Sequence, residues 1–305
     1  MSVTAADAPA RARRTRSRRR LRAQATPYLF LAPVVLLFLT FKAYPTLYAL
    51  YLSLTTRSGG QDVFVGADNF TRLLGDPLFW QALRNTVLIL VTQVPVMLVI
   101  AVLLAVAFNS ALLKGRAVLR VSYFLPIVMG LVAYGILFSA LMNYQDGLIN
   151  FVLDAVGLPK VPWLADPFWA KMAIVVAMTW HYTGNNAVIY LAQLQSIPTE
   201  LYEAASVDGA TARQRLWHIT LPGLRPALFL TVVLSTIGTL QLFDEPYVLT
   251  NGGPDNATLT IGMYLYQNAF QFFDFGYASA IGYVLTAIVG VVALAQMLIL
   301  RRRSR

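Results

Sequence analysis

Side chains that could do chemistry are few in this 305-residue chain. Cysteine is absent, and His181 and His218 are the only histidines. Neither histidine belongs to an HxxxH or HExxH pattern, so no pair of helical metal ligands is expected. The chain also has no GxSxG segment, which would present a nucleophile, and no GxxxxGK(S/T) segment, which would cradle the phosphates of ATP. We therefore expect no catalytic residue, no metal and no cofactor bound by this chain.

The acidic pair that lies nearest to the interior of an apolar segment is Asp244 and Glu245. Ionisable residues inside a membrane segment are functional by default, and a proton relay through this pair would define an ion-coupled secondary transporter or channel. Pro246 follows directly, and it places the pair within a turn or two of the outer end of the segment. A solvated helix end or a pairing role is therefore the favoured interpretation, with ion coupling as the alternative.

Membrane-spanning segments must position these residues. The chain is 57% hydrophobic and only 12% charged, with a mean hydropathy of +0.60, whereas a soluble domain carries about 25% charged residues. A helix needs about 20 mostly apolar residues to span the hydrocarbon core. Six segments meet this requirement, over residues 28–52, 83–108, 118–142, 169–194, 224–249 and 277–300. The sequence thus predicts an all-α integral membrane protein, with residues 28–300 as one bundle of six transmembrane helices.

The net charge of +10 is concentrated at the two ends of the chain. Eight arginines lie in residues 1–27 and four in residues 301–305, which is typical of topological anchors and not of a nucleic-acid-binding surface. In all, 18 of the 24 Lys and Arg residues fall on the side of the termini, so both termini are predicted to be cytoplasmic. The tail over 1–27 is expected to be disordered and to contact anionic lipid. A cleaved signal is disfavoured because the first apolar run is too long and no cleavage site follows.

A polar loop over residues 198–222 separates the fourth and fifth apolar segments on the predicted cytoplasmic side. Pro198 suits the first turn of a helix, and Gly209 can adopt a positive φ that ends it. A second short helix is expected over about 211–219, broken by Pro222 before the fifth span. Two short helices joined at a glycine would form a knob that passes force from a partner into the bundle. An ordinary cytoplasmic loop is the alternative.

The residues of this loop resemble a known motif. The pattern EAAxxDGA over 203–210, followed by IxLP over 219–222, matches every fixed position of the EAA motif in permease subunits of bacterial binding-protein-dependent ABC importers. In that family the loop is a coupling helix that docks in a cleft of the ATP-hydrolysing subunit. The resemblance implies the type I importer permease fold, and ATP and Mg²⁺ bound by a separate chain. It also implies an ATPase-coupling contact made by Glu203, Ala204, Ala205, Asp208 and Gly209.

A second resemblance narrows the class of importer. The segment FDEPYVLTNGGP over 243–254, followed by Thr258 and by GYASA over 276–280, is similar to the maltose-, lactose- and glycerol-phosphate-type first permease subunit of carbohydrate importers. Early Ala-Pro and Tyr-Pro pairs at 32–33 and 44–45 also fit. Compared with the maltose permease, this chain lacks extra N-terminal helices and a large external domain. The resemblance therefore implies the six-helix core of a sugar permease.

A sugar path needs aromatic faces for stacking and amides or hydroxyls for hydrogen bonds. The fourth segment carries WHYTGNN over 180–186, and the fifth carries several hydroxyls near residue 235. Such residues also serve as contacts between helices, at about 0.6 kcal/mol each. Ungapped counting from the EAA motif places the sugar contacts of the maltose-type permease at His181, Tyr182, Asn185, Ser235, Gly238, Thr239 and Leu242. An aromatic residue and two amides of that site are replaced here by Asn185, Thr239 and Leu242, so maltose itself is not implied.

Together these resemblances imply a multi-pass permease of the bacterial inner membrane. It would form half of a heterodimer with a second homologous permease, served by two ATP-binding subunits and an extracytoplasmic sugar-binding protein. A membrane enzyme acting on a lipid-linked sugar is a third possibility. It would need paired acids facing a cavity, and the sequence alone does not identify such a pair.

Overall fold

The computed structural model describes residues 28, 30–110 and 113–303. Among these residues, four helices are long and apolar enough to cross a membrane, Phe30–Ser53, Pro77–Asn109, Ala212–Leu240 and Phe275–Ile299, and one bent pair of helices can count as a fifth span. The expected all-α membrane fold is confirmed. The predicted disordered tail over 1–27 lies outside the described residues, and the last helix, α14, continues through Arg303 into the predicted basic C-terminus.

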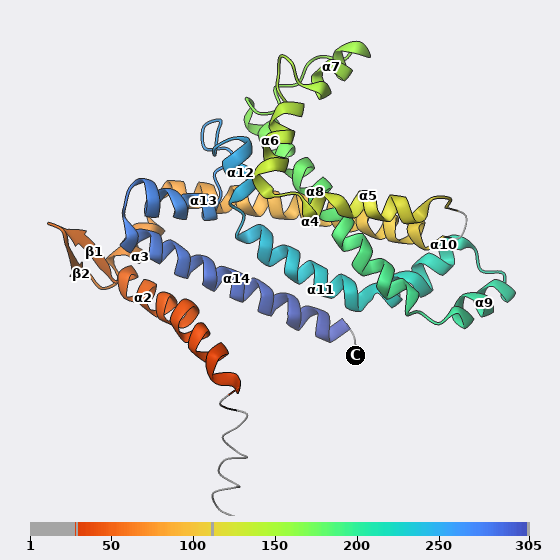
Figure 1. The fold of residues 1–305 in the computed structure, drawn as a ribbon, viewed down its shortest axis with the longest axis horizontal. Coiled ribbons are helices and arrows are strands. Elements are labelled where there is room, and N and C mark those ends of the chain that lie inside the picture. The colour runs from red at the N-terminus through yellow and green to blue at the C-terminus, as the bar shows by residue number, and fades with distance from the viewer. Residues whose placement is uncertain (1–27, 29, 111–112, 304–305) are drawn as a thin grey trace, which may run out of the picture.

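The third predicted span, over 118–142, is wrong as a single helix. It consists of α5, Arg116–Val128, and α6, Leu131–Leu141, which are bent by 103° relative to each other. The break arises because Met129 and Gly130 both adopt extended backbone conformations, so the helical hydrogen bonds stop and restart in a new direction. A further helix, α7 (Leu148–Ala155), follows, and it projects with α6 away from the bundle (Figure 1).

The fourth predicted span corresponds to α8, Pro167–Gln195. Its start follows from Asp166, whose side chain accepts hydrogen bonds from the backbone N–H groups of Phe168 and Trp169, while Pro167 needs no donor at the first helical position. At about 1.5 Å per residue the helix is long enough to cross a bilayer. Its polar middle leaves it less apolar than the four spans above, as expected for a helix that carries functional groups.

The fifth predicted span, over 224–249, is too long at one end. Helix α11, Leu221–Leu240, stops at Gln241, and a separate short helix, α12, covers Asp244–Leu249. At the other end, the expected break at Pro222 is wrong. The π-helical turn Leu216–Thr220 joins the short helix α10 (Ala212–Arg215) to α11. Pro222 follows this turn directly, where the regular helical hydrogen-bond pattern is already interrupted.

The end of the bundle that we call the hairpin end contains β1 (Thr55–Ser58), β2 (Gln61–Phe64) and α3 (Asp68–Leu74). The strands are antiparallel with Thr55 opposite Phe64. The opposite end, the loop end, contains α9 (Thr199–Val207) and α10. Between the two ends α4 (Pro77–Asn109), α5, α8, α11 and α14 lie along the long axis of the molecule (Figure 1).

Close packing of these long helices fixes the space between them. Three clusters of buried apolar residues follow the bundle, and α4 contributes to each of them. Helices α8 and α5 approach at Gly184, where a Cβ atom would lie only 1.6 Å from the carbonyl oxygen of Tyr123. Helix α2 (Tyr44–Ser53), ahead of the hairpin, packs on α14, where Tyr283 donates a hydrogen bond to the carbonyl of Thr46.

Candidate functional site

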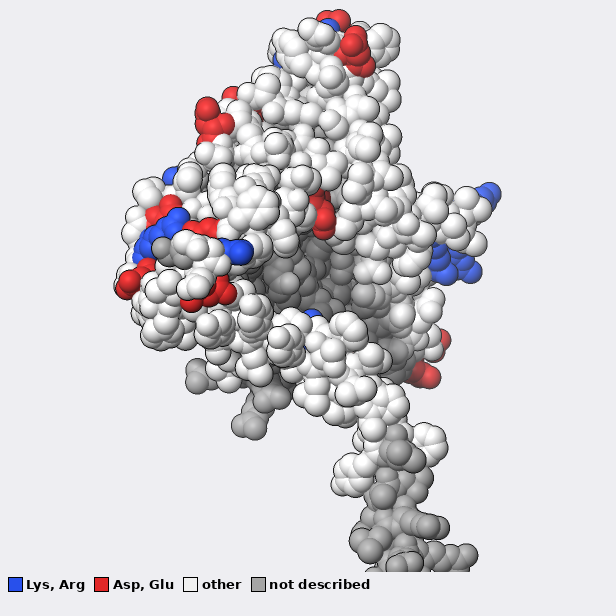
Figure 2. Space-filling model, turned by 60° about the vertical axis from the view of Figure 1, so that its left-hand side comes forward, with Lys and Arg blue, Asp and Glu red and all other residues white. Residues whose placement is uncertain are grey.

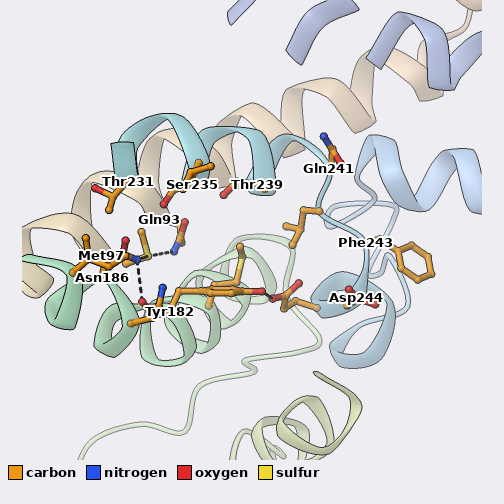
Figure 3. A pocket seen from close by; sticks show the side chains of 17 residues that line it. Gln93, Met97, Tyr182, Asn186, Thr231, Ser235, Thr239, Gln241, Phe243 and Asp244 are labelled. Atoms are coloured by element: carbon orange, nitrogen blue, oxygen red, sulfur yellow. Dashed lines mark hydrogen bonds between the residues drawn. The ribbon is translucent and has the colours of Figure 1, made fainter. Parts of the chain in front are cut away.

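A cavity of about 270 Å³ lies between α4, α8, α11 and the start of α12. Its lining mixes apolar side chains with amide, hydroxyl and carboxylate groups. Figure 3 shows Ser235 and Thr239 on α11 across this space from Tyr182 and Asn186 on α8. A mostly apolar cavity with a few convergent polar groups is the usual form of a small-molecule site.

The predicted substrate-path residues fall largely in this cavity. Six of the seven line it, although they come from two helices and the segment after α11: Tyr182, Asn185, Ser235, Gly238, Thr239 and Leu242. The space beside Gly238 is open, because a Cβ atom built there would meet no heavy atom within 4 Å. The folded chain therefore brings these six positions to one surface.

His181 occupies a different place from the other predicted path residues. Its side chain is 2% exposed, and its ring stacks on that of Tyr134 with centroids 4.3 Å apart. The same imidazole meets the ring of Tyr182 edge to face at 4.6 Å. His181 thus lies behind the cavity wall, where it fixes the orientation of Tyr182.

The acidic pair also lines the cavity. Glu245 is 3% exposed and accepts a hydrogen bond from the Tyr182 hydroxyl at 3.3 Å, while Asp244 is half-buried. Glu245 is thus hydrogen-bonded to a residue of the neighbouring helix. A solvated helix end does not describe this residue, because α11 stops earlier than predicted and the turn at Gln241 directs α12 back against the bundle.

Two lining residues from α4 were missed by the sequence interpretation. The Nε2 atom of Gln93 lies 3.3 Å from the sulfur of Met97, and the amide nitrogen of Asn186 lies 3.6 Å from the same sulfur. Asn186 also donates to the carbonyl of Tyr182 at 3.0 Å. The available signal was Gln93 itself, a buried amide in an otherwise apolar stretch.

The predicted coupling residues lie together at the loop end. Glu203, Ala204 and Ala205 are on α9, and Asp208 and Gly209 follow directly. All are exposed except Ala205, which is half-buried. The next helix begins with a capping box, in which Thr211 and Gln214 exchange hydrogen bonds. The knob is thus an exposed, internally braced structure.

Two contacts tie α9 to the long helix that follows it. The Tyr202 hydroxyl and the Thr220 hydroxyl are 3.0 Å apart, and Arg215 donates to the Ser206 hydroxyl at 2.9 Å. Gly209 has a φ of +74°, as expected from its type, and the amide of Ala210 donates back to the carbonyl of Ala205 at 2.8 Å. Displacement of α9 would therefore be transmitted to α11.

Comparison with known proteins shows the family to which this chain belongs. Residues 77–305 match the family described as binding-protein-dependent transport system inner membrane component. The chain is 45% identical to the lactose transport system permease protein LacF of Rhizobium radiobacter over 282 residues, which cover 91% of this chain and 94% of LacF. It is 35% identical to the arabinooligosaccharides transport system permease protein AraP of Halalkalibacterium halodurans over 276 residues, which cover 90% and 87%.

Solved structures agree with these relatives. A chain from the crystal structure of a bacterial ABC transporter involved in the import of the acidic polysaccharide alginate superimposes with a TM-score of 0.84 at 26% identity, covering 95% of this chain and 100% of that chain. The protein described here therefore belongs to the family of inner membrane components of binding-protein-dependent transport systems. It is a transport permease subunit with the type I ABC importer permease fold, and it is not itself an enzyme.

Proposed function

We propose that this chain forms half of the path of a bacterial ATP-driven carbohydrate importer, with the cavity between α4, α8 and α11 as its sugar-contacting surface. The observation that carries the proposal is the convergence of Tyr182, Asn185 and Ser235 on one cavity. Stacking faces, amides and hydroxyls are the groups that recognise sugars. Relatives named for lactose and arabinooligosaccharide transport support the sugar class.

The knob over α9 is the proposed ATPase contact, with the five EAA-motif residues given above as its docking surface. This chain binds no cofactor of its own in the proposal, and ATP and Mg²⁺ belong to two separate ATP-binding subunits. Docking can drive transport only if those subunits bind the two states of the permease with different affinities. The contacts of Tyr202 and Ser206 on α9 with the following helix supply a physical route.

A second homologous permease is the proposed partner within the membrane. The helix Phe30–Ser53 has no buried residue in its most apolar stretch, and Phe30 and Phe41 are 78% and 73% exposed. Lipid covers some of this surface in the proposal, and the second permease completes the path from the open side of the cavity. An extracytoplasmic sugar-binding protein would deliver the sugar, as supported by an alginate transporter solved in complex with a periplasmic protein.

The proposed orientation places the loop end and both termini in the cytoplasm of a bacterial cell. Lys and Arg residues are concentrated on that side of the sequence, in agreement with the positive-inside rule. The hairpin end, with α3 and the start of α4, then faces outward. In this orientation the acidic pair lies toward the outer mouth of the cavity.

Blocking the cavity tests the proposal. Gly238→Leu places an isobutyl group in the open space beside residue 238, and it should abolish uptake of radiolabelled lactose or arabinooligosaccharide by proteoliposomes that hold the full complex, ATP and binding protein. Gly290→Leu on α14 is the matched control, because a Cβ atom there also meets nothing within 4 Å. Unchanged uptake by Gly238→Leu would show that the sugar passes elsewhere.

A further inference from the structure

Two of the residues that line the cavity are acids, half-buried Asp244 and buried Glu245. Among the lining residues that the structure describes, Asp244 and Glu245 are the acids, and there is no Lys, Arg or His. Sites that bind carboxylates, sulfonates or phosphates usually supply Arg or Lys, because charge-assisted hydrogen bonds match those groups. The lining therefore has the wrong sign for an anionic sugar.

The two carboxylates lie where a passing ligand would meet them. Figure 3 shows Asp244 at the α12 end of the cavity, beyond the α11 hydroxyls. Glu245 is held in the wall by the 3.3 Å hydrogen bond from Tyr182, so its position is fixed by a residue that also lines the path. The hollowed face in Figure 2 has an acidic patch on its upper edge and a small basic area on its lower edge, which belongs to no lining residue.

Apolar neighbours strengthen the effect of these charges. Met97, Met178 and Leu242 line the same cavity, and low-dielectric walls increase the force that a fixed charge exerts on a nearby ligand. Carboxylate oxygens also accept hydrogen bonds from sugar hydroxyls. The same pair would therefore attract an uncharged polyol and repel an acid of the same shape.

We infer that the cavity takes uncharged sugars and rejects anionic ones, with Asp244 and Glu245 as the residues that determine this selection. The inference rests on the proposed sugar path and names the substrate class of that path. It separates this chain from its structural neighbour, which is described as importing an acidic polysaccharide, although the two folds superimpose. It also gives the acidic pair a role other than ion coupling.

The test compares sugars that differ only in charge. Binding of lactose and lactobionate, and of galactose and galacturonate, is measured by titration calorimetry on the purified complex of both permeases and the ATPase subunits, without binding protein, at pH 7.5. The uncharged member of at least one pair should bind about tenfold or more tightly than its acid. The double variant Asp244→Asn with Glu245→Gln should reduce this difference in affinity to about threefold, mainly by increasing the affinity for the acid. Gln at position 245 keeps an acceptor for the Tyr182 hydroxyl.

Asp255→Asn is the matched control. It removes a negative charge from the segment that follows α12 but lies outside the cavity lining, and its φ of 49° suits asparagine. Asp255→Asn should preserve the full difference in affinity between the uncharged sugar and its acid. Equal binding of sugar and acid by the wild type, or an unchanged difference in the double variant, would overturn charge selection and leave the path intact. Failure of every uncharged sugar to bind would overturn the sugar path and this inference together.

Discussion

Gly184 of α8 lies against the carbonyl oxygen of Tyr123 in α5 with no room for a side chain between them. A Cβ atom at position 184 would sit 1.6 Å from that oxygen, so the two backbones are in direct contact. Gly184 is two residues from Tyr182 and beside Asn185, both of which line the cavity. The contact therefore fixes the wall of the proposed path as well as the bundle.

Gly184→Ala should destabilise the permease because backbone atoms of α5 cannot rotate away. Overpacking of a close contact costs about 1–3 kcal/mol, so the thermal unfolding midpoint of the detergent-purified complex should fall. Gly290→Ala, where the added Cβ atom meets nothing within 4 Å, should leave the midpoint unchanged. Equal effects of the two variants would show that α5 and α8 do not approach as described.

Asp76, which caps α4 at the hairpin end, should make stability depend on pH. Burial opposes ionisation of its carboxylate, but hydrogen bonds from the Tyr264 and Tyr277 hydroxyls and from the backbone of Leu78 lower the pKa of Asp76 below its ordinary value of 3.8. A depressed folded-state pKa stabilises the fold above pH 3.8, and this stabilisation is lost as the pH falls through the lowered value.

Asp76→Asn keeps the helix cap but removes the charge. It should lower stability by about 1–3 kcal/mol at pH 7, and the difference from wild type should shrink toward pH 3. Thermal denaturation of the complex across this pH range measures both quantities. Exposed Asp146→Asn serves as the comparison variant. A difference that persists unchanged at pH 3 would contradict the proposed ionisation.

Tyr182→Phe removes the hydroxyl that donates to buried Glu245. A buried acceptor that loses its donor costs about 1–3 kcal/mol, so the variant should unfold at a lower temperature. Tyr144→Phe removes a hydroxyl from a side chain that is 52% exposed, and it should have no effect. If both variants behaved like the wild type, the Tyr182–Glu245 hydrogen bond would contribute nothing to the fold.

Substitution of Gly209 should reduce stability, because the residue has a left-handed backbone conformation. Its φ is +74° and a Cβ atom would meet nothing within 4 Å, so any penalty comes from conformation and not from crowding. Gly209→Ala should cost about 1 kcal/mol, and Gly209→Asn less. Hydrogen exchange of the last amides of α9 measures this local loss. Faster exchange in Gly209→Asn than in Gly209→Ala would reverse the expected order.

Much of the fold follows from local sequence signals. Apolar length predicts the spans, Asp166-Pro167 marks the start of α8, and the glycine at 209 ends α9. The break at Met129 and Gly130 follows Pro126, and proline and glycine both weaken a helix, but the apolar length on both sides favours a single span. Beyond the break, α6 packs against α12 at Gly135, where Val248 leaves no room for a Cβ atom.

The site was predictable only in part for a similar reason. Hydroxyl and amide residues on α8 and α11 stand out in apolar segments, whereas the position of Glu245 depends on where α11 stops. The fifth predicted span, extended to Leu249 across Asp244-Glu245-Pro246, misses the turn at Gln241. Burial of the carboxylate therefore could not be read from the segment itself, and neither could the contribution of Met97 from a helix far away in sequence.

In the proposed function the exposed knob couples ATP hydrolysis to the sugar path, and ATP hydrolysis in proteoliposomes measures this coupling. The full complex is assayed with and without sugar-loaded binding protein, comparing wild type, Gly209→Asp and Gly157→Asp. Gly157 has a similar φ of +78° with open space around it, but it lies beyond α7. Stimulation by loaded binding protein in wild type and Gly157→Asp, with loss in Gly209→Asp, is the predicted result. Full stimulation in Gly209→Asp, or sugar uptake that needs no ATPase, would contradict the account.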